Sequence, residues 1–302
     1  MLTSIRGLTA ASLSAGLLFT AAPAFAAESS DKESISEELI AATVAIDNEA
    51  TNENETVLNT RVEGISVERA GEPIDENKAN DVGGEGPFSF SANITFATEY
   101  RFRGVDLSGG DFAVQGGFDV GLPAGFYVGT WASNLDEDTV GFGSTELDIY
   151  GGWSGDLGGL SADIGVIGYL YPDAPTAASP TDYVEFYGSL SGEIGPGSLT
   201  AGIAYAPDQD SLGSTDNLYI YGDLSVGIPD TPLSLNAHLG YTDGFLTFTD
   251  DSKAFDWSVS ADLSAGPLTF SGAYIGVEGD ELVDPGRVFT DDTFVLSVSA
   301  SF

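Results

Sequence analysis

The chain ends in the nine residues FVLSVSASF, numbered 294–302. Phe294 and every second residue after it, as far as Phe302, are apolar, whereas serine occupies three of the four positions between them. This alternation gives a β-strand one apolar and one polar face. A terminal strand that stops on an aromatic residue is typical of transmembrane β-barrels of the outer membrane, in which one face meets lipid and the other meets the lumen.

The same two-residue period starts at Phe88. Between residues 88 and 103 the even-numbered positions are mostly aromatic or aliphatic, and the odd-numbered positions are mostly polar or charged. A helix would spread both sets around its circumference, so the pattern predicts a strand. The sequence predicts twelve such strands in all: 88–103, 112–122, 125–134, 145–155, 160–171, 182–192, 198–206, 217–228, 233–242, 255–264, 268–277 and 292–302.

The connections between these strands alternate in length. Short turns are expected at 123–124, 156–159, 193–197, 229–232 and 265–267. Longer and mostly acidic connections are expected at 104–111, 135–144, 172–181, 207–216, 243–254 and 278–291. An antiparallel barrel with an even number of strands and both ends in the periplasm has this layout, with its long loops outside.

A soluble β-sandwich also has strands with one apolar face, so alternation alone does not separate it from a membrane barrel. The regular order of the connections, the export signal described below and the terminal Phe302 favour the barrel. Aromatic residues near the ends of the apolar faces also predict the girdles of a membrane barrel. These are Phe88, Phe90 and Trp153 at one end, and Tyr100, Phe102, Tyr205, Tyr241, Trp257 and Tyr274 at the other.

Residues 1–26 have the features of a secretory signal peptide. Arg6 precedes an apolar run from Leu8 to Phe19, and Ala24-Phe25-Ala26 is a small-x-small cleavage site. No other segment has the roughly 18 apolar residues of a helical span, so we expect any membrane insertion to use strands. The absence of cysteine excludes a disulfide-stabilised scaffold.

Residues 27–86 differ in composition from the rest of the chain. They are rich in Glu, Asp and Asn and contain no aromatic residue. Such a segment buries too little apolar surface to offset its ordering entropy, so we predict a mostly disordered periplasmic arm. The alternative is a lumen plug or a partner-binding helix, because Ser34 and Glu37 match a capping box. The barrel itself is predicted for residues 87–302.

The chain is strongly acidic. It has 9 Lys and Arg residues against 47 Asp and Glu residues, which gives a formal net charge of −38. Nucleic acid and anionic membrane surfaces are therefore poor partners, and cations are good ones. The alternative is that the acidic excess only keeps the protein soluble or adapted to salt.

Several ordered motifs resemble the TorF family of porins. They are Tyr100 to Gly104 (YRFRG), Gln115 to Asp119 (QGGFD), Gly125 to Asn134 (GFYVGTWASN), Glu146 to Trp153 (ELDIYGGW) and Asp182 to Leu190 (DYVEFYGSL). The resemblance covers about residues 88–302 and implies an outer-membrane barrel with a channel role. The acidic arm lies outside the family pattern.

The polar faces of the predicted strands identify candidate pore-lining residues, in which nine carboxylates outnumber two guanidinium groups. They are Glu99, Arg101, Arg103, Asp119, Glu146, Asp148, Asp163, Glu185, Asp223, Asp256 and Asp262. Carboxylates in a narrow path with a low-dielectric wall favour cations, so we expect a passive, cation-preferring porin. The alternative is that Arg101 and Arg103 form salt bridges that fill a small lumen, leaving a closed structural barrel that displays acidic loops.

The other candidate sites have simpler explanations. Lumen tyrosines such as Tyr169 and Tyr183 are suited to stacking on sugars but more often fill volume. The sequence Asp208-x-Asp210 lacks the glutamate of a calcium loop, although loop carboxylates remain able to bind divalent cations loosely. The chain has one histidine, His238, and no Gly-x-Ser-x-Gly nucleophile elbow. We therefore predict that the chain is not an enzyme and that it has no catalytic residue, no cofactor and no metal site.

The predicted location is the bacterial outer membrane. The expected partners are outer-membrane lipid, small solutes or cations, and the barrel-assembly machinery. We expect that machinery to bind the C-terminal strand that ends in Phe302. No nucleic-acid partner is expected.

Overall fold

The computed structural model describes residues 88–175, 180–247, 249–281 and 290–302. The predicted signal peptide (1–26) and acidic arm (27–86) lie outside the described residues. Within the described part no helix is long and apolar enough to cross a membrane.

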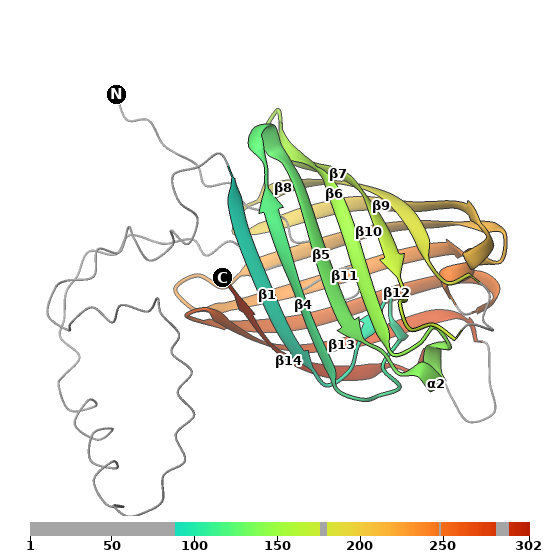
Figure 1. Ribbon diagram of the computed structural model, residues 1–302. Helices are drawn as coiled ribbons and strands as arrows, with labels where there is room; N and C mark the ends of the chain where they lie inside the picture. Colours follow the sequence, from blue (N-terminus) through green and yellow to red (C-terminus); the bar gives the residue numbers. More distant parts are fainter. Residues whose placement is uncertain (1–87, 176–179, 248, 282–289) are drawn as a thin grey trace, which may run out of the picture. The chain divides into compact units, whose positions relative to one another are not determined.

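Twelve antiparallel strands form one closed barrel, as predicted (Figure 1). Each strand pairs with its neighbours along the chain, and the barrel closes where Ile94 of β1 lies opposite Ala300 of β14. The strands are β1 (Ser89–Ala97), β4 (Ala113–Gly121), β5 (Phe126–Asn134), β6 (Thr145–Leu157), β7 (Leu160–Leu170), β8 (Tyr183–Ile194), β9 (Gly197–Gln209), β10 (Thr215–Gly227), β11 (Leu233–Gly244), β12 (Thr249–Ala265), β13 (Leu268–Glu281) and β14 (Thr293–Ser301).

The alternation of side chains sorts apolar residues to the outside and polar residues to the lumen. Phe90, Ile164, Leu239 and Phe294 are among many large apolar side chains that are more than half exposed on the outer surface. Most acidic side chains on the opposite strand faces are buried, among them Glu146, Asp148 and Glu185. An apolar surface of this extent all around a barrel is suited to lipid and excludes the soluble sandwich.

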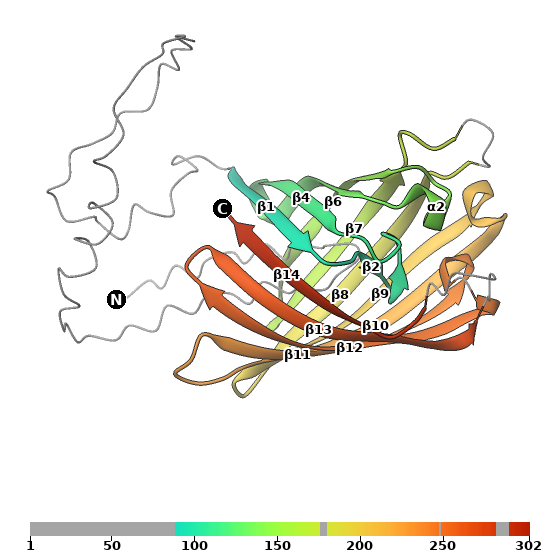
Figure 2. The same cartoon turned by 90° about the horizontal axis from the view of Figure 1, so that it is seen from below.

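The first predicted strand, 88–103, is wrong in its second half. The strand β1 ends at Ala97, and the chain then turns into the barrel and forms a two-stranded hairpin from β2 (Arg101–Phe102) and β3 (Val105–Asp106) (Figure 2). Tyr100 and Phe102 therefore do not belong to a lipid-facing girdle, because their side chains are 0% and 7% exposed. A crossing strand needs only about 9–11 residues, so the nine residues of β1 already span the barrel wall and those after Ala97 are not required in it.

Several strands are longer than predicted at the end that carries the long connections. The strand β9 continues to Gln209, and β12 already begins at Thr249, so parts of the predicted loops 207–216 and 243–254 belong to the sheet. Short helical turns lie in four of the connections: η2 (Pro123–Gly125), α2 (Glu137–Val140), η3 (Asp210–Leu212) and η4 (Phe245–Thr247). Because β9, β10 and β12 extend into the predicted loops, the connections after β9 and β11 are no longer than the turn at 228–232.

Candidate functional site in the barrel lumen

The inward hairpin, residues 98–112, occupies the lumen at the end of the barrel with the long connections. Arg103 and Gly104 connect β2 to β3, and both have positive φ values, 49° and 79°. Two successive residues of positive φ are the signature of a tight two-residue hairpin turn. A Cβ atom on Gly104 would collide with Val277 of β13, so the turn also needs glycine for space.

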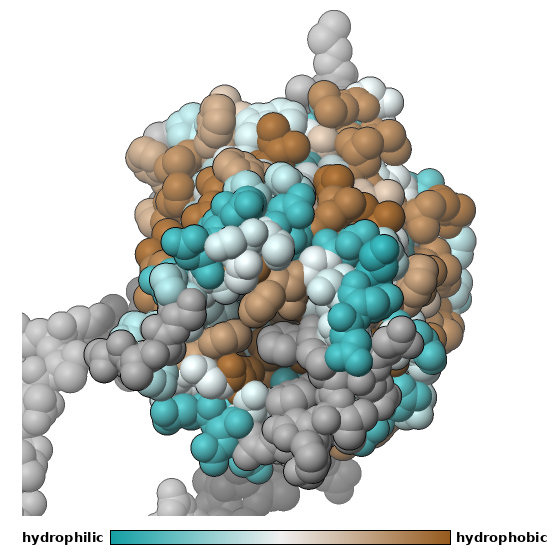
Figure 3. Space-filling model, turned by 90° about the vertical axis from the view of Figure 1, so that its right-hand side faces the viewer, coloured by the Kyte–Doolittle hydropathy of each residue, from teal (hydrophilic) through white to brown (hydrophobic). Residues whose placement is uncertain are grey.

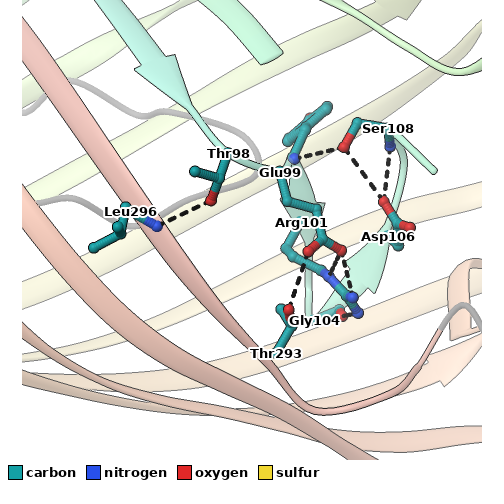
Figure 4. Close-up of polar contacts among 9 residues, drawn as sticks. Thr98, Glu99, Arg101, Gly104, Asp106, Ser108, Thr293 and Leu296 are labelled. Carbon is teal, nitrogen blue, oxygen red and sulfur yellow. Dashed lines mark hydrogen bonds and ion pairs between the residues drawn. The ribbon is translucent and has the colours of Figure 1, made fainter. Parts of the chain in front are cut away.

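Polar contacts fix both sides of the hairpin (Figure 4). The Thr98 hydroxyl accepts a 3.0 Å bond from the amide of Leu296, and Thr293 donates to Glu99 at 3.1 Å. Arg101 forms an ion pair with Glu99 and donates to the carbonyl oxygen of Gly104 at 3.0 Å. The hairpin is therefore attached to β14 as well as to its own backbone.

Arg103 extends the hairpin across the lumen to the far wall. Its Nη2 atom donates to both carboxylate oxygens of Glu185 on β8, at 3.0 and 2.8 Å. The guanidinium group also lies over the ring of Tyr219 on β10, with its central carbon 4.2 Å from the ring centroid. A two-oxygen contact and a stacked aromatic ring together suit arginine better than lysine.

Two carboxylates on β6 face the hairpin from another side. The Tyr100 hydroxyl donates to Glu146 at 3.0 Å, and burial, followed by the charges of Glu146 and Asp148, raises the pKa of Tyr100 well above its ordinary value. The Tyr100 hydroxyl therefore stays protonated and donates its hydrogen bond to Glu146. Asp148 is 0% exposed, and neither of its carboxylate oxygens has a hydrogen-bond partner among the described residues.

His238 lies between two aspartates in the middle of the lumen. Its Nδ1 atom is 2.6 Å from Asp223, and its Nε2 atom is 2.7 Å from Asp256 and 2.8 Å from the hydroxyl of Tyr219. An imidazole ring donates from both nitrogens only as imidazolium, so the two carboxylate contacts favour the charged form. His238 is thus the centre of an ion-pair network, a role that the sequence pattern did not predict.

Tyrosine and amide groups pair the remaining lumen carboxylates toward the end with the short turns. Tyr150 donates to Asp119 at 2.6 Å, and Tyr127 donates to Asp163 at 2.7 Å. Asp262 accepts hydrogen bonds from Asn236 at 2.7 Å and from Ser271 at 2.5 Å. Most lumen tyrosines therefore serve as fillers and hydrogen-bond donors in this structure.

Hydrophilic residues gather over the long-loop end, and apolar residues surround its outer circumference (Figure 3). Around the hairpin the lumen side chains of Glu146, Asp148 and Glu185 are almost completely buried. Ser191, Thr200 and Asn236, nearer the short-turn end, are only half-buried. The lumen side chains are therefore more deeply buried around the hairpin than nearer the short-turn end.

A family model described as "Bacterial protein of unknown function (Gcw_chp)" matches residues 81–302. The chain belongs to this family. The match does not confirm the resemblance to the TorF family. None of the curated proteins compared with this Gcw_chp protein matches its sequence.

Three solved structures illustrate what the Gcw_chp barrel is similar to. The superposition with a KdgM porin covers 70% of this chain and 99% of the porin chain, at 8% sequence identity and a TM-score of 0.47. A NanC porin covers 71% with 99% of its length, at 10% identity and a TM-score of 0.48. An outer membrane channel from Pseudomonas putida F1 covers 73% with 97% of its length, at 12% identity and a TM-score of 0.41.

The structure places the side chains of the eleven predicted pore-lining residues in the lumen, but not all on strands. Glu99, Arg101 and Arg103 belong to the inward hairpin, in which Arg101 pairs with Glu99 and Arg103 contacts a carboxylate of the far wall. The structure also adds residues that sequence reasoning missed, namely Asp106, Tyr127, Trp131 and the charged His238. For Trp131 and His238 the available signal was a strand position directly opposite a predicted lumen residue, Asp148 and Asp223 respectively.

The described residues contain no group of three or more His, Cys, Asp or Glu side chains suited to a metal ion. The loop carboxylates that were considered for loose cation binding include Asp280 and Glu281, whose side chains lie outside the described part. The prediction that the chain is not an enzyme stays a prediction.

Proposed function

We propose that this Gcw_chp protein is a porin-like channel of the bacterial outer membrane, through which small solutes diffuse passively and cations pass in preference to anions. The observation that carries the proposal is the sorting of side chains on a closed barrel. Its outer surface is suited to lipid. Its lumen holds ten carboxylates, the nine predicted ones and Asp106, against the guanidinium groups of Arg101 and Arg103 and the imidazole ring of His238. A narrow path with this charge excess attracts cations and repels anions.

The inward hairpin is the constriction of the proposed channel. It crosses the lumen through the pair between Arg103 and Glu185, so ions have to pass beside a transverse arrangement of opposite charges. The half-buried Asp119, below this level, is well placed to meet a passing cation. Outer-membrane lipid and the barrel-assembly machinery remain proposed partners, the latter through β14 and the 72% exposed Phe302.

A second candidate is supported by the extent of burial around the hairpin. Since Glu146, Asp148 and Glu185 are almost inaccessible, the hairpin also fits a closed barrel that presents its acidic connections to a partner. A membrane hydrolase is the weakest candidate, because the hydrogen bonds of His238 to described residues are with two aspartates and a tyrosine and not with a serine.

Single-channel recording of the refolded full chain in a planar bilayer tests the proposal. Discrete current steps, with a reversal potential in a salt gradient that indicates cation selectivity, are expected. Asp119→Asn should weaken the selectivity, whereas Asp208→Asn, on an exposed loop-end position, serves as a matched control and should leave it unchanged. Anion selectivity would overturn the carboxylate mechanism.

A second variant separates a channel from a closed barrel. Ala97 and Ala113 are paired neighbours, so a short Gly-Ser linker is able to replace residues 99–110 without breaking the barrel. This deletion should enlarge the current steps. If both the full chain and the deletion variant fold but show no current steps, the channel proposal is wrong. The closed barrel that presents its acidic connections to a partner is then favoured.

A further inference from the structure

The charges around the inward hairpin do not balance. Glu146, Asp148 and Glu185 are all 0–1% exposed, and Arg103 is engaged by both oxygens of Glu185. The charged groups that act on Asp148 are Glu146 and Glu185, both of the same sign. Arg103 is paired with Glu185. The carboxylates of Glu146 and Asp148 therefore leave two negative charges in a site almost without solvent.

Asp148 lacks the partners that a buried carboxylate needs. Neither Oδ1 nor Oδ2 accepts a hydrogen bond from any described residue, whereas Asp119 and Asp262 each have at least one donor. An ionised carboxylate without hydrogen bonds is unfavourable in a dry interior, so such groups are paired, protonated or bound to a cation. The orphaned oxygens therefore point to a missing positive charge.

The strand neighbours of Asp148 among the described residues are two aromatic side chains and a carboxylate. Trp131 lies directly opposite on β5, and Tyr169 lies opposite on β7. Glu146 is two residues away on the same face of β6 and contacts the Tyr100 hydroxyl of the hairpin. Oxygen ligands of this type suit hard cations such as Ca²⁺.

We propose that Glu146 and Asp148 bind one divalent cation, with Ca²⁺ as the best fit, beneath the inward hairpin. The ion would neutralise both carboxylates, and water or hydroxyl oxygens would complete its coordination. Because Glu146 also holds Tyr100, the ion would fasten the hairpin to β6. With only two carboxylate ligands the site belongs to the weak class, with a dissociation constant of ~10⁻⁴–10⁻³ M. This inference does not depend on whether the barrel conducts.

Luminescence of Tb³⁺, a calcium substitute, tests the site in the refolded full chain. Trp131 lies opposite Asp148, so tryptophan excitation should sensitise a bound Tb³⁺ ion, and added Ca²⁺ should displace it. Asp148→Asn and Trp131→Phe should each abolish most of the sensitised emission. Asp262→Asn is the matched control, because Asp262 is a buried lumen carboxylate whose hydrogen-bond donors are already present, and it should keep the emission.

Two outcomes would overturn the proposal. The first is equal Tb³⁺ emission from the unmodified chain and from Asp148→Asn, which would assign the ion to the exposed acidic connections. The second is the absence of Ca²⁺-displaceable emission at neutral pH, which would mean that a shared proton neutralises the pair. If Asp148→Asn does not fold, Glu146→Gln replaces it, and Ca²⁺ should raise the unfolding temperature of the unmodified chain but not of this variant.

Discussion

Arg103 and Glu185 are 82 residues apart in the chain and form a buried ion pair, in which one guanidinium nitrogen reaches both carboxylate oxygens at 2.8 and 3.0 Å. Their side chains are 7% and 1% exposed. The pair joins the tip of the inward hairpin to β8, on a different part of the barrel wall.

We expect Glu185→Gln to destabilise the barrel. The substitution leaves the Arg103 guanidinium buried without its counter-charge, and the loss of one member of a buried pair costs about 3–5 kcal/mol. Urea unfolding in lipid vesicles measures the change in the free energy of unfolding. The double variant Arg103→Met with Glu185→Met should recover much of the loss, because it removes both charges.

The same substitution should also release the hairpin. Val105 is buried, and the chain contains no cysteine, so Val105→Cys gives a single thiol that should resist a water-soluble thiol reagent. Adding Glu185→Gln should make this thiol reactive. Asp111→Cys, at an exposed position, should react in both backgrounds. Equal protection of Val105→Cys with and without Glu185 would show that the pair does not hold the hairpin.

We expect His238→Ala to destabilise the lumen through like-charge repulsion. The imidazole ring separates Asp223 and Asp256, with contacts of 2.6 and 2.7 Å. Its loss leaves two mostly buried carboxylates without a cation, a cost of about 3–5 kcal/mol. Unfolding by urea measures the loss, and adding Asp223→Asn and Asp256→Asn to the same chain should restore part of the stability. A neutral effect of His238→Ala would contradict the ion-pair network.

On the outer surface, we expect the stability cost of a charged substitution to depend on its depth in the membrane. Leu239 lies in the middle of β11 and is 59% exposed, and Leu157 ends β6 beside a short turn and is 56% exposed. Leu239→Arg should destabilise the barrel in vesicles by ~2–4 kcal/mol, whereas Leu157→Arg should cost only ~0–1 kcal/mol. Equal and small costs at both positions would argue against a lipid-facing surface.

Two of the long connections are joined by a hydrogen-bonded carboxylate. Ser144 donates to Asp173 from its hydroxyl at 2.5 Å and from its amide at 3.0 Å, and the side-chain bond, followed by the backbone bond, lowers the pKa of Asp173. Because the folded pKa lies below the unfolded value, this contact contributes fully above the unfolded pKa and is lost as the pH falls through the folded pKa.

Ser144→Ala should therefore raise the pKa of Asp173 toward its ordinary value. Ser144→Thr keeps a hydroxyl and should preserve most of the shift. Carboxyl NMR titration of the refolded chain in detergent micelles measures both variants. An unchanged pKa in Ser144→Ala would mean that the two connections are not joined in solution.

The sequence by itself determined the barrel. Because successive side chains of a strand point to opposite faces, the alternation of residues such as Phe294 and Ser297 with their neighbours decides which face points outward and which faces the lumen. The order of short and long connections then decides the topology. Lumen-facing residues on strands, such as Asp163 and Glu185, follow from the same rule, since facing the lumen depends only on position along the strand.

Only the tertiary structure decided the hairpin and its partners. The residues from Thr98 to Phe102 continue the alternation of β1, and the local pattern does not distinguish a strand that goes on outward from one that turns inward. The choice depends on distant groups: Leu296 and Thr293 on β14, Glu146 on β6 and Glu185 on β8. The same holds for His238 and for the unpartnered Asp148, because closure of the barrel, and not chain neighbourhood, sets which charges meet across the lumen.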